Sequence, residues 1–143
     1  MSSDESYDIP EGYYYTKDHE WVKRKNKDSN AIVVGITDYA AKMLNDIVYV
    51  VLPDEGSTFK SKEVFGQVES VKTVSDIYMP LTGRVVKTNQ ELTKMPEAIS
   101  RSPYSDGWML EVETTDLDKE LRELLSASEY RSFIEEIKDS ESD

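Results

Sequence analysis

The sequence contains no cysteine and only one histidine, His19. Without cysteine the chain has no disulfide, no thiolate nucleophile and no cysteine-ligated zinc. A Ser-His-Asp triad would have to use His19, and no G-x-S-x-G segment accompanies it. The six glycines do not have the spacing of a phosphate-binding loop. The protein therefore has little catalytic equipment, and an attached cofactor would have to supply any redox or group-transfer chemistry.

Long apolar runs and basic patches are also missing. No apolar run approaches the length that crosses a bilayer, so we expect no membrane contact. The net charge is −12, and the one basic cluster, 23–27, is typical of a polar loop between strands. Nucleic acid is not an expected partner, because phosphates would repel so acidic a protein. The N-terminus resembles neither a secretion signal nor a transit peptide, which predicts a cytoplasmic protein, or a mitochondrial matrix protein if a presequence has been removed.

The length and composition predict one soluble domain. The chain has 143 residues, of which 38% are hydrophobic and 32% are charged. Pro10 and Gly12 mark the entry to the domain, which we place at 13–137 after a flexible N-terminus at 1–12. An acidic tail at 138–143 follows, and we expect the chain to act as a monomer.

Short strands dominate the predicted secondary structure. Runs of β-branched and aromatic residues, separated by glycine and proline, predict a mainly β fold of the small barrel or sandwich kind. Thr37 and Asp38 can cap a short helix over 39–44 after the third strand. Asn45 is suited to the left-handed conformation that often ends such a helix.

Two helices are expected at the C-terminal end, over about 116–125 and 127–137. Two capping boxes support them, Thr115 with Asp118 and Ser126 with Glu129. Before them, 89–92 is predicted as a loop and Pro96 as the start of a short helix. Trp108 and His19 are interpreted as packing residues, with the histidine bonded to backbone in a turn or the core.

Residues 64–80 predict a β-hairpin with a lysine at its tip. The runs 64–71 and 74–78 suit half-buried strands, and Lys72 and Thr73 fall between them. A two-residue connection is expected there, of undetermined type because it lacks Asn-Gly or Gly-X. At such a tip the ammonium of Lys72 would project into water with no obligatory partner. Lys72 is therefore the candidate functional lysine.

The same stretch carries a resemblance to a known family. Glu69-Ser70-Val71-Lys72, followed by Ser75-Asp76 and by Gly83, resembles the lipoylation site of the H protein of the glycine cleavage system. The resemblance implies that Lys72 carries lipoic acid through an amide bond. It also implies that Glu69, Gly83 and Asp76 help a lipoyl-attaching enzyme to recognise the site.

A second motif, Lys17-Asp18-His19-Glu20-Trp21, is similar to another signature of that family. It implies that Glu20 and Asp18 lie near a cleft that shelters the loaded arm. A carboxylate there could accept a charge-assisted hydrogen bond from the ammonium of a methylamine-bearing lipoyl group.

The resemblance implies a barrel-sandwich hybrid fold and a carrier without catalytic activity. The expected function is transport of an aminomethyl group on lipoyl-Lys72 from a pyridoxal-phosphate glycine decarboxylase (P protein) to an aminomethyltransferase (T protein). A dihydrolipoamide dehydrogenase (L protein) would then reoxidise the arm.

Other functions stay open from the sequence. An H-like lipoate-binding protein could serve sulfur metabolism or lipoyl relay, and Thr73, Met79 and Met95 differ from many H proteins. A biotin carrier is disfavoured, because Val71 and Thr73 stand where that fold usually has methionines. An unmodified interaction module would leave the grouping of Glu69, Lys72 and Gly83 unexplained.

Overall fold

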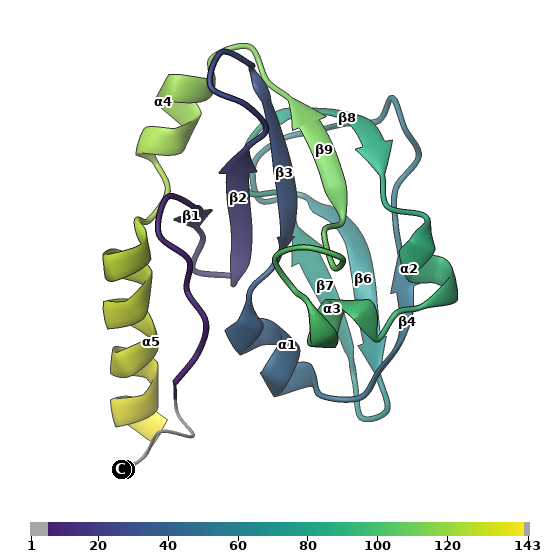
Figure 1. Cartoon of the computed structure of the whole chain (residues 1–143), viewed down its shortest axis with the longest axis vertical. Coiled ribbons are helices and arrows are strands. Elements are labelled where there is room, and N and C mark those ends of the chain that lie inside the picture. The colour runs from purple at the N-terminus through teal and green to yellow at the C-terminus, as the bar shows by residue number, and fades with distance from the viewer. Residues whose placement is uncertain (1–5, 142–143) are drawn as a thin grey trace.

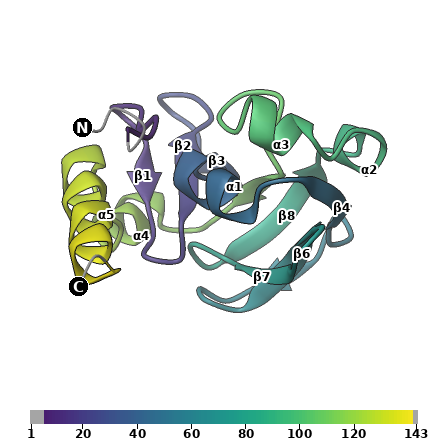
Figure 2. The same ribbon diagram turned by 90° about the horizontal axis from the view of Figure 1, so that it is seen from below.

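Two antiparallel β-sheets form the body of the protein, with helices around them (Figures 1 and 2). The computed structural model describes residues 6–141. One sheet has six strands in the order β1-β2-β3-β9-β8-β5, and the other has three in the order β4-β6-β7. The mainly β, two-sheet architecture is confirmed, although the sheets do not close into a barrel within the described chain.

The six-stranded sheet is assembled from both ends of the chain, since β3 pairs with β9. Its strands, in sheet order, are β1 (Tyr14–Tyr15), β2 (Glu20–Arg24), β3 (Ala31–Ile36), β9 (Leu110–Glu113), β8 (Gly83–Thr88) and β5 (Thr58–Phe59).

The three-stranded sheet contains β4 (Ile47–Val51), β6 (Val64–Ser70) and β7 (Val74–Tyr78). Side chains alternate along β6, so that Val68 is buried while Gln67 and Glu69 are exposed. The main hydrophobic core combines residues of both sheets, including Ile32, Val68, Val85 and Val112. Burial of this shared apolar surface is the main favourable contribution to folding.

The helices are α1 (Asp38–Leu44), α2 (Glu91–Lys94), α3 (Ala98–Arg101), α4 (Leu117–Arg122) and α5 (Ala127–Glu141). The helix after the third strand is confirmed: the Thr37 side chain accepts a hydrogen bond from the Ala40 N–H, and Asn45 has a φ of 58°. The capping box of Ser126 and Glu129 also forms. The helix α2 stands where a loop was expected.

The expected helix over 116–125 is wrong in its bounds and its cap. Asp116, not Thr115, caps α4 by accepting a hydrogen bond from the Lys119 N–H. The helix ends early because Leu125 pairs with Tyr15 of β1 through two backbone hydrogen bonds of 2.9 and 2.8 Å. The final helix continues to Glu141, and so includes part of the segment expected as an acidic tail.

An aromatic cluster joins β1, β2 and α1 to α5. The rings of Tyr15 and Tyr130 stack with centroids 4.7 Å apart, and the Trp21 indole donates a hydrogen bond to the Pro103 carbonyl. Trp108 is half-buried against this cluster, in agreement with its predicted packing role. The network of contacts attaches the C-terminal helix to the edge of the six-stranded sheet.

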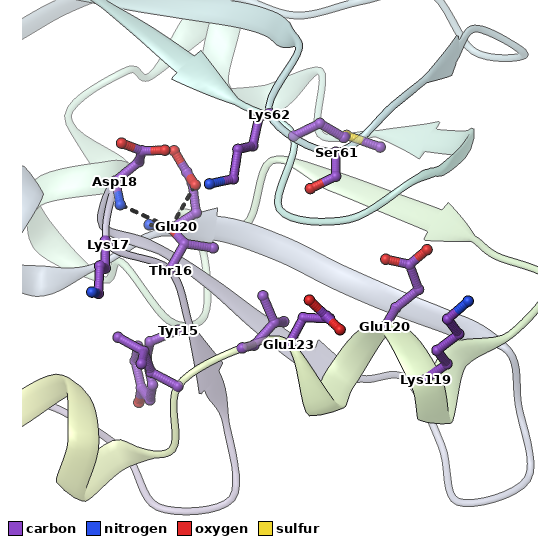
Figure 3. Close-up of a pocket in the computed structure, with 13 residues that line it drawn as sticks. Tyr15, Thr16, Lys17, Asp18, Glu20, Ser61, Lys62, Lys119, Glu120 and Glu123 are labelled. Carbon is purple, nitrogen blue, oxygen red and sulfur yellow. Dashed lines mark hydrogen bonds between the residues drawn. The ribbon is translucent and has the colours of Figure 1, made fainter.

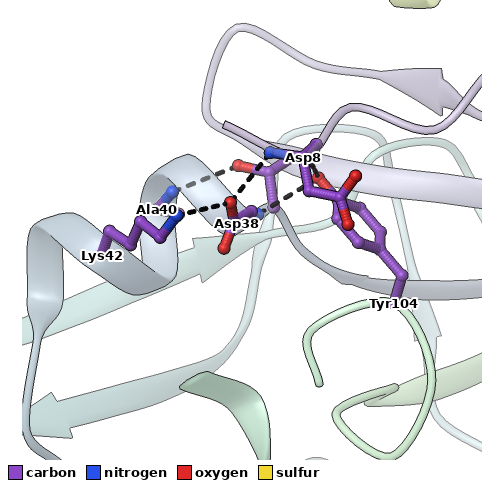
Figure 4. Close-up of polar contacts among 6 residues, drawn as sticks. Asp8, Asp38, Ala40, Lys42 and Tyr104 are labelled. Carbon is purple, nitrogen blue, oxygen red and sulfur yellow. Dashed lines mark hydrogen bonds and ion pairs between the residues drawn. The ribbon is translucent and has the colours of Figure 1, made fainter. Parts of the chain in front are cut away.

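The segment before β1 also contacts this region. The Asp8 N–H donates to the Asp38 carboxylate, and the Tyr104 hydroxyl donates to the Asp8 carbonyl (Figure 4). Ile9 is buried, and the Pro10 carbonyl accepts a hydrogen bond from the Tyr15 hydroxyl. Residues 8–10 therefore pack on the domain, whereas a flexible start was expected; 1–5 lie outside the described residues.

Among residues 6–141, no helix combines the length and apolar character that a bilayer crossing requires.

The hydroxyl of Tyr130 gives a test of the aromatic cluster. It lies 2.8 Å from both His19 Nδ1 and Thr37 Oγ1. Tyr130→Phe keeps the ring but leaves these two groups without their partner, so we expect a loss of about 1–3 kcal/mol in unfolding free energy. Urea denaturation measures this loss. The matched control is Tyr49→Phe, which alters an exposed ring and should change stability little; equal effects of the two variants would contradict the packing described.

Candidate functional site: the lysine hairpin and the Glu20 cleft

The turn between β6 and β7 is built on Ser70. The Ser70 N–H donates to the Thr73 carbonyl at 2.7 Å, so Val71 and Lys72 are the two turn residues. The expected pair was Lys72 and Thr73, one position later. The buried Ser70 hydroxyl oxygen decides the register, because it accepts hydrogen bonds from the N–H groups of Lys72 and Thr73 at 3.3 and 3.2 Å.

Lys72 is exposed at the tip of this hairpin. The neighbouring Val71 N–H donates to the Asp46 carbonyl at 3.1 Å, which attaches the tip to the start of β4. The ammonium of Lys72 takes part in no ion pair within the part of the chain that the structure describes. The site therefore presents an exposed lysine at a hairpin tip, as the sequence predicts.

Glu69 and Asp76 lie on the outer face of the three-stranded sheet, on the two strands that the lysine turn connects. Glu69 is paired with Val74, and Asp76 with Gln67, across the β6–β7 ladder. The Gln67 side-chain amide donates to the Asp76 carboxylate at 3.0 Å. Both carboxylates are exposed, so a partner that reaches Lys72 could contact them.

Gly83 lies in the other sheet, at the start of β8 and opposite Phe59. A Cβ atom at this position would meet Val112 Cγ1 at 2.5 Å and the Glu113 carbonyl oxygen at 2.6 Å. The absence of a side chain therefore allows β8 to pack against β9. The structure gives Gly83 a packing role in a different sheet from Lys72.

Glu20 is a buried carboxylate at the start of β2, with 1% of its surface exposed. Its Oε1 accepts a hydrogen bond from the Thr16 hydroxyl at 2.7 Å, and its Oε2 accepts one from the Tyr78 N–H at 3.2 Å. Burial raises the pKa of Glu20 to about 7, although these two hydrogen bonds favour the ionised form. Because Tyr78 ends β7, Glu20 connects the six-stranded sheet to the lysine hairpin.

The turn 16–20 positions Asp18, the acid next to Glu20. Thr16 holds this turn: its hydroxyl accepts hydrogen bonds from the N–H groups of Asp18 and Glu20, and its carbonyl accepts one from the His19 N–H. Asp18 is exposed beside Glu20, and its negative charge contributes to the raised pKa of Glu20. The structure thus brings Asp18 and Glu20 together.

His19 is a packing residue, as expected, but its partner is a side chain. Its Nδ1 lies 2.8 Å from the Tyr130 hydroxyl, and its ring contacts Tyr39 and Phe133. Burial lowers the pKa of His19, which favours the neutral ring. The positive φ of 72° at His19 turns the chain so that Glu20 enters β2.

A cleft of about 530 Å³ opens beside Glu20 (Figure 3), and we refer to it as the Glu20 cleft. One wall comes from the turn before β2 and another from α4 and the segment after it. Apolar surface and charges of both signs line it: Tyr15, Thr16, Lys17, Asp18, Glu20, Ser61, Lys62, Met79, Lys119, Glu120, Glu123, Leu124 and Leu125. Such a cleft can hold an elongated group with an apolar body and a polar end.

Comparison with known proteins identifies the family. The model of the family described as "Glycine cleavage H-protein" matches residues 13–137. The chain belongs to the glycine cleavage H-protein family. A glycine cleavage system H protein of Anaeromyxobacter sp. strain K is 47% identical over 129 residues, 90% of this chain and 98% of that protein. A probable H protein of Pyrococcus abyssi is 44% identical over 131 residues, 92% of this chain and 96% of that protein.

A solved structure agrees with this assignment. The crystal structure of a glycine cleavage system H protein from Mycobacterium marinum aligns with a TM-score of 0.77 and 39% identity, covering 87% of this chain and 97% of that one. The chain is therefore a lipoyl carrier of glycine cleavage and a non-catalytic subunit. Attachment of lipoate is a general property of this family.

Sequence reasoning did not identify Thr16, Tyr78 or the α4 wall as parts of the site. Thr16 precedes Glu20 by four residues, which is a usable signal for a side chain that closes a turn. Tyr78 contributes only its backbone N–H, and any residue but proline could do so. The α4 wall depends on the long-range pairing of Leu125 with Tyr15.

The raised pKa of Glu20 predicts a pH dependence. In the folded protein this carboxyl stays protonated up to about pH 7, whereas in the unfolded chain it ionises at a lower pH. The free energy of unfolding therefore falls as the pH rises from the unfolded pKa towards 7. Glu20→Gln resembles the protonated form and should remove this loss, which amounts to at most about 3 kcal/mol. Urea unfolding between pH 5 and pH 8 measures it.

The control for this prediction is Glu123→Gln, which removes an exposed carboxylate from the same cleft. We expect this variant to follow the pH profile of the unsubstituted protein. A profile for Glu20→Gln that runs parallel to that of Glu123→Gln would contradict the assignment of the pH dependence to Glu20.

Proposed function

We propose that the protein carries lipoic acid in amide linkage on Lys72 and transports the aminomethyl group of glycine between the enzymes of the glycine cleavage system. The observation that carries this proposal is the exposed side chain of Lys72 at the tip of a hydrogen-bonded hairpin, in a chain that belongs to the H-protein family. An unmodified interaction module would not require such a lysine.

Attached to Lys72, the lipoyl group would supply a disulfide that can accept the aminomethyl carbon of glycine in exchange for CO₂, with the second sulfur reduced to a thiol. We expect the P protein to load the arm, the T protein to pass its one-carbon unit to tetrahydrofolate with release of ammonia, and the L protein to restore the disulfide.

The hairpin suits a carrier for two physical reasons. A tether keeps the reactive end near a docked active site at an effective concentration of order mM, so no free intermediate has to diffuse. Amide formation also removes the positive charge of Lys72, which lowers the free-energy cost of laying the arm against apolar protein.

Such an arm can extend towards the Glu20 cleft. From Lys72 to Tyr78 the chain advances six residues, or roughly 20 Å at about 3.4 Å per residue. A lipoyl-lysine has about eleven bonds between its Cα and its dithiolane ring, or roughly 14 Å when extended, and the ring adds to that length. The arm can therefore run along most of β7 towards Tyr78, whose N–H donates a hydrogen bond to Glu20.

In the cleft, we assign the half-buried Leu124 and Leu125 to contact with the apolar part of the arm. Glu20 and Asp18 would receive its ammonium end when the arm is loaded, because a carboxylate accepts a strong hydrogen bond from a cation. Binding of that cation would also favour the ionised form of Glu20, whose pKa burial raises.

Glu69 and Asp76 are assigned to recognition by the lipoyl-attaching enzyme, because both carboxylates are exposed on the face that leads to Lys72. Gly83 would contribute through the packing of β8 against β9. The net charge of −12 would speed encounters with basic docking surfaces on the partner enzymes. We infer that the carrier is a cytoplasmic monomer that binds these partners in turn.

Replacement of Lys72 tests the attachment site. Lys72→Arg keeps the charge but removes the primary amine, so we expect no incorporation when the unlipoylated protein is incubated with a lipoate ligase, ATP and lipoate. Intact mass spectrometry measures incorporation, and thermal unfolding should be unchanged because the side chain is exposed. Lys60→Arg, at another exposed lysine, is the control and should be modified normally. Modification of the Lys72→Arg protein would refute the proposal.

Replacement of Glu69 tests recognition. Glu69→Ala should slow lipoylation of the folded protein by roughly tenfold, the effect of losing one hydrogen bond to a charged group. A time course at limiting ligase, followed by mass spectrometry, gives the rate. Glu97→Ala removes an exposed carboxylate before α3 and should leave the rate unchanged. Equal rates for the two variants would show that Glu69 does not act in recognition.

A further inference from the structure

Lys62 occupies a backbone position that favours glycine. It has a φ of 76°, in the left-handed region, within the turn that joins β5 to β6. The turn is held there because the Lys62 N–H donates to the Met79 carbonyl at 2.8 Å and the Glu63 N–H donates to the Lys60 carbonyl at 3.0 Å. An L-residue is strained in this conformation and glycine is not. Such strain is most common at positions where the side chain has a function.

The Lys62 side chain lines the Glu20 cleft. In Figure 3 it extends towards the end of the cleft that holds Asp18 and Glu20, whereas Lys119 lies on α4 near Glu120. The Lys62 ammonium takes part in no ion pair within residues 6–141. It is a cation that extends towards the carboxylate end of the cleft without forming an ion pair with Asp18 or Glu20.

The other charged groups around the cleft are placed differently. Lys17 lies over the ring of Phe133, with its Nζ 5.6 Å from the ring centroid. The α4 wall contributes Lys119, Glu120 and Glu123. Asp18 adds a second negative charge beside Glu20. Three lysines line this cleft. Lys17 lies over Phe133 and Lys119 lies on α4, whereas the side chain of Lys62 extends from the β5–β6 turn towards the carboxylate end.

We propose that Lys62 is a positioning residue for the lipoyl arm, a displaceable cation that competes with the ammonium of the loaded arm for the carboxylates of Glu20 and Asp18. This inference rests on the proposed function. With an uncharged arm, Lys62 neutralises part of the negative charge in the cleft. With a cationic arm, like charges repel, so Lys62 must turn away or the arm must leave. The loaded arm is therefore held less tightly and can be withdrawn by the next enzyme.

The first experiment uses the unlipoylated protein and measures the pKa of Glu20 by ¹³C NMR of its carboxyl group. Lys62→Gly removes the charge at a position where glycine is unstrained, and should raise the pKa of Glu20 by roughly 0.5. Lys62→Arg keeps the charge and Lys119→Met removes a charge from the α4 wall; both should leave the pKa close to its original value. No change in Lys62→Gly, or an equal change in Lys119→Met, would overturn the proposal.

The second experiment uses lipoylated protein loaded with glycine and a glycine decarboxylase, then freed of the enzyme. At pH 8, where Glu20 is ionised with or without Lys62, spontaneous loss of the methylamine cargo should be roughly threefold slower in Lys62→Gly than in Lys62→Arg, because one repulsive charge is absent. Mass spectrometry of the intact protein follows the cargo. Equal or faster loss in Lys62→Gly would overturn the proposal.

Failure of the proposed function would be seen separately. If lipoate did not attach to Lys72, the unsubstituted protein would acquire no cargo, and mass spectrometry would show this before any variant was compared. Failure of the role of Lys62 alone would leave loading intact and remove only the difference between the variants.

Discussion

The carboxylate of Glu20 joins the two sheets of this protein. Glu20 lies at the start of β2 in the six-stranded sheet, and its carboxylate accepts a hydrogen bond from the N–H of Tyr78 at the end of β7 in the three-stranded sheet. The other carboxylate oxygen accepts a hydrogen bond from the Thr16 hydroxyl. Together with the hydrophobic core that the two sheets share, this connection fixes the lysine hairpin relative to the cleft. A carrier depends on that distance because its arm has a fixed length.

Burial of this carboxylate is unfavourable for folding when it is ionised, and the free energy is recovered when a cation binds to it. With a pKa of about 7, Glu20 can carry a charge or remain neutral under ordinary conditions. A cleft with such a group would favour a cationic arm over an uncharged one. In the role that we propose for Lys62, its charge and that of Asp18 would adjust how tightly the arm is held.

The parts of the structure that depend on local chemistry were predictable from the sequence. The lysine hairpin, the cap at Thr37, the left-handed Asn45 and the capping box of Ser126 with Glu129 follow from side chains within a few residues of one another. The hairpin turn was misplaced by one residue, because the Ser70 hydroxyl accepts the N–H groups of Lys72 and Thr73 and selects the register, and the expected turn did not take this side chain into account.

Long-range contacts account for most of the remaining differences. The expected length of α4 was wrong because the segment after the helix pairs Leu125 with Tyr15. The expected Thr115 cap was wrong for a local reason, since the Asp116 side chain accepts the Lys119 N–H instead. In the site, Asp18 and Glu20 were predicted through the family resemblance, but the contact between Glu20 and Tyr78 joins residues far apart in sequence. Lys62 could not be predicted at all, since its left-handed backbone and its direction depend on a turn that closes against Met79.

Attachment of the lipoyl group to Lys72 is tested most directly by peptide mass spectrometry of the protein purified from its native cells. We expect a lipoyl modification on the peptide that contains Lys72 and on no other lysine. An unmodified Lys72 in cells whose other lipoyl proteins are modified, or a lipoyl group on a different lysine, would contradict it.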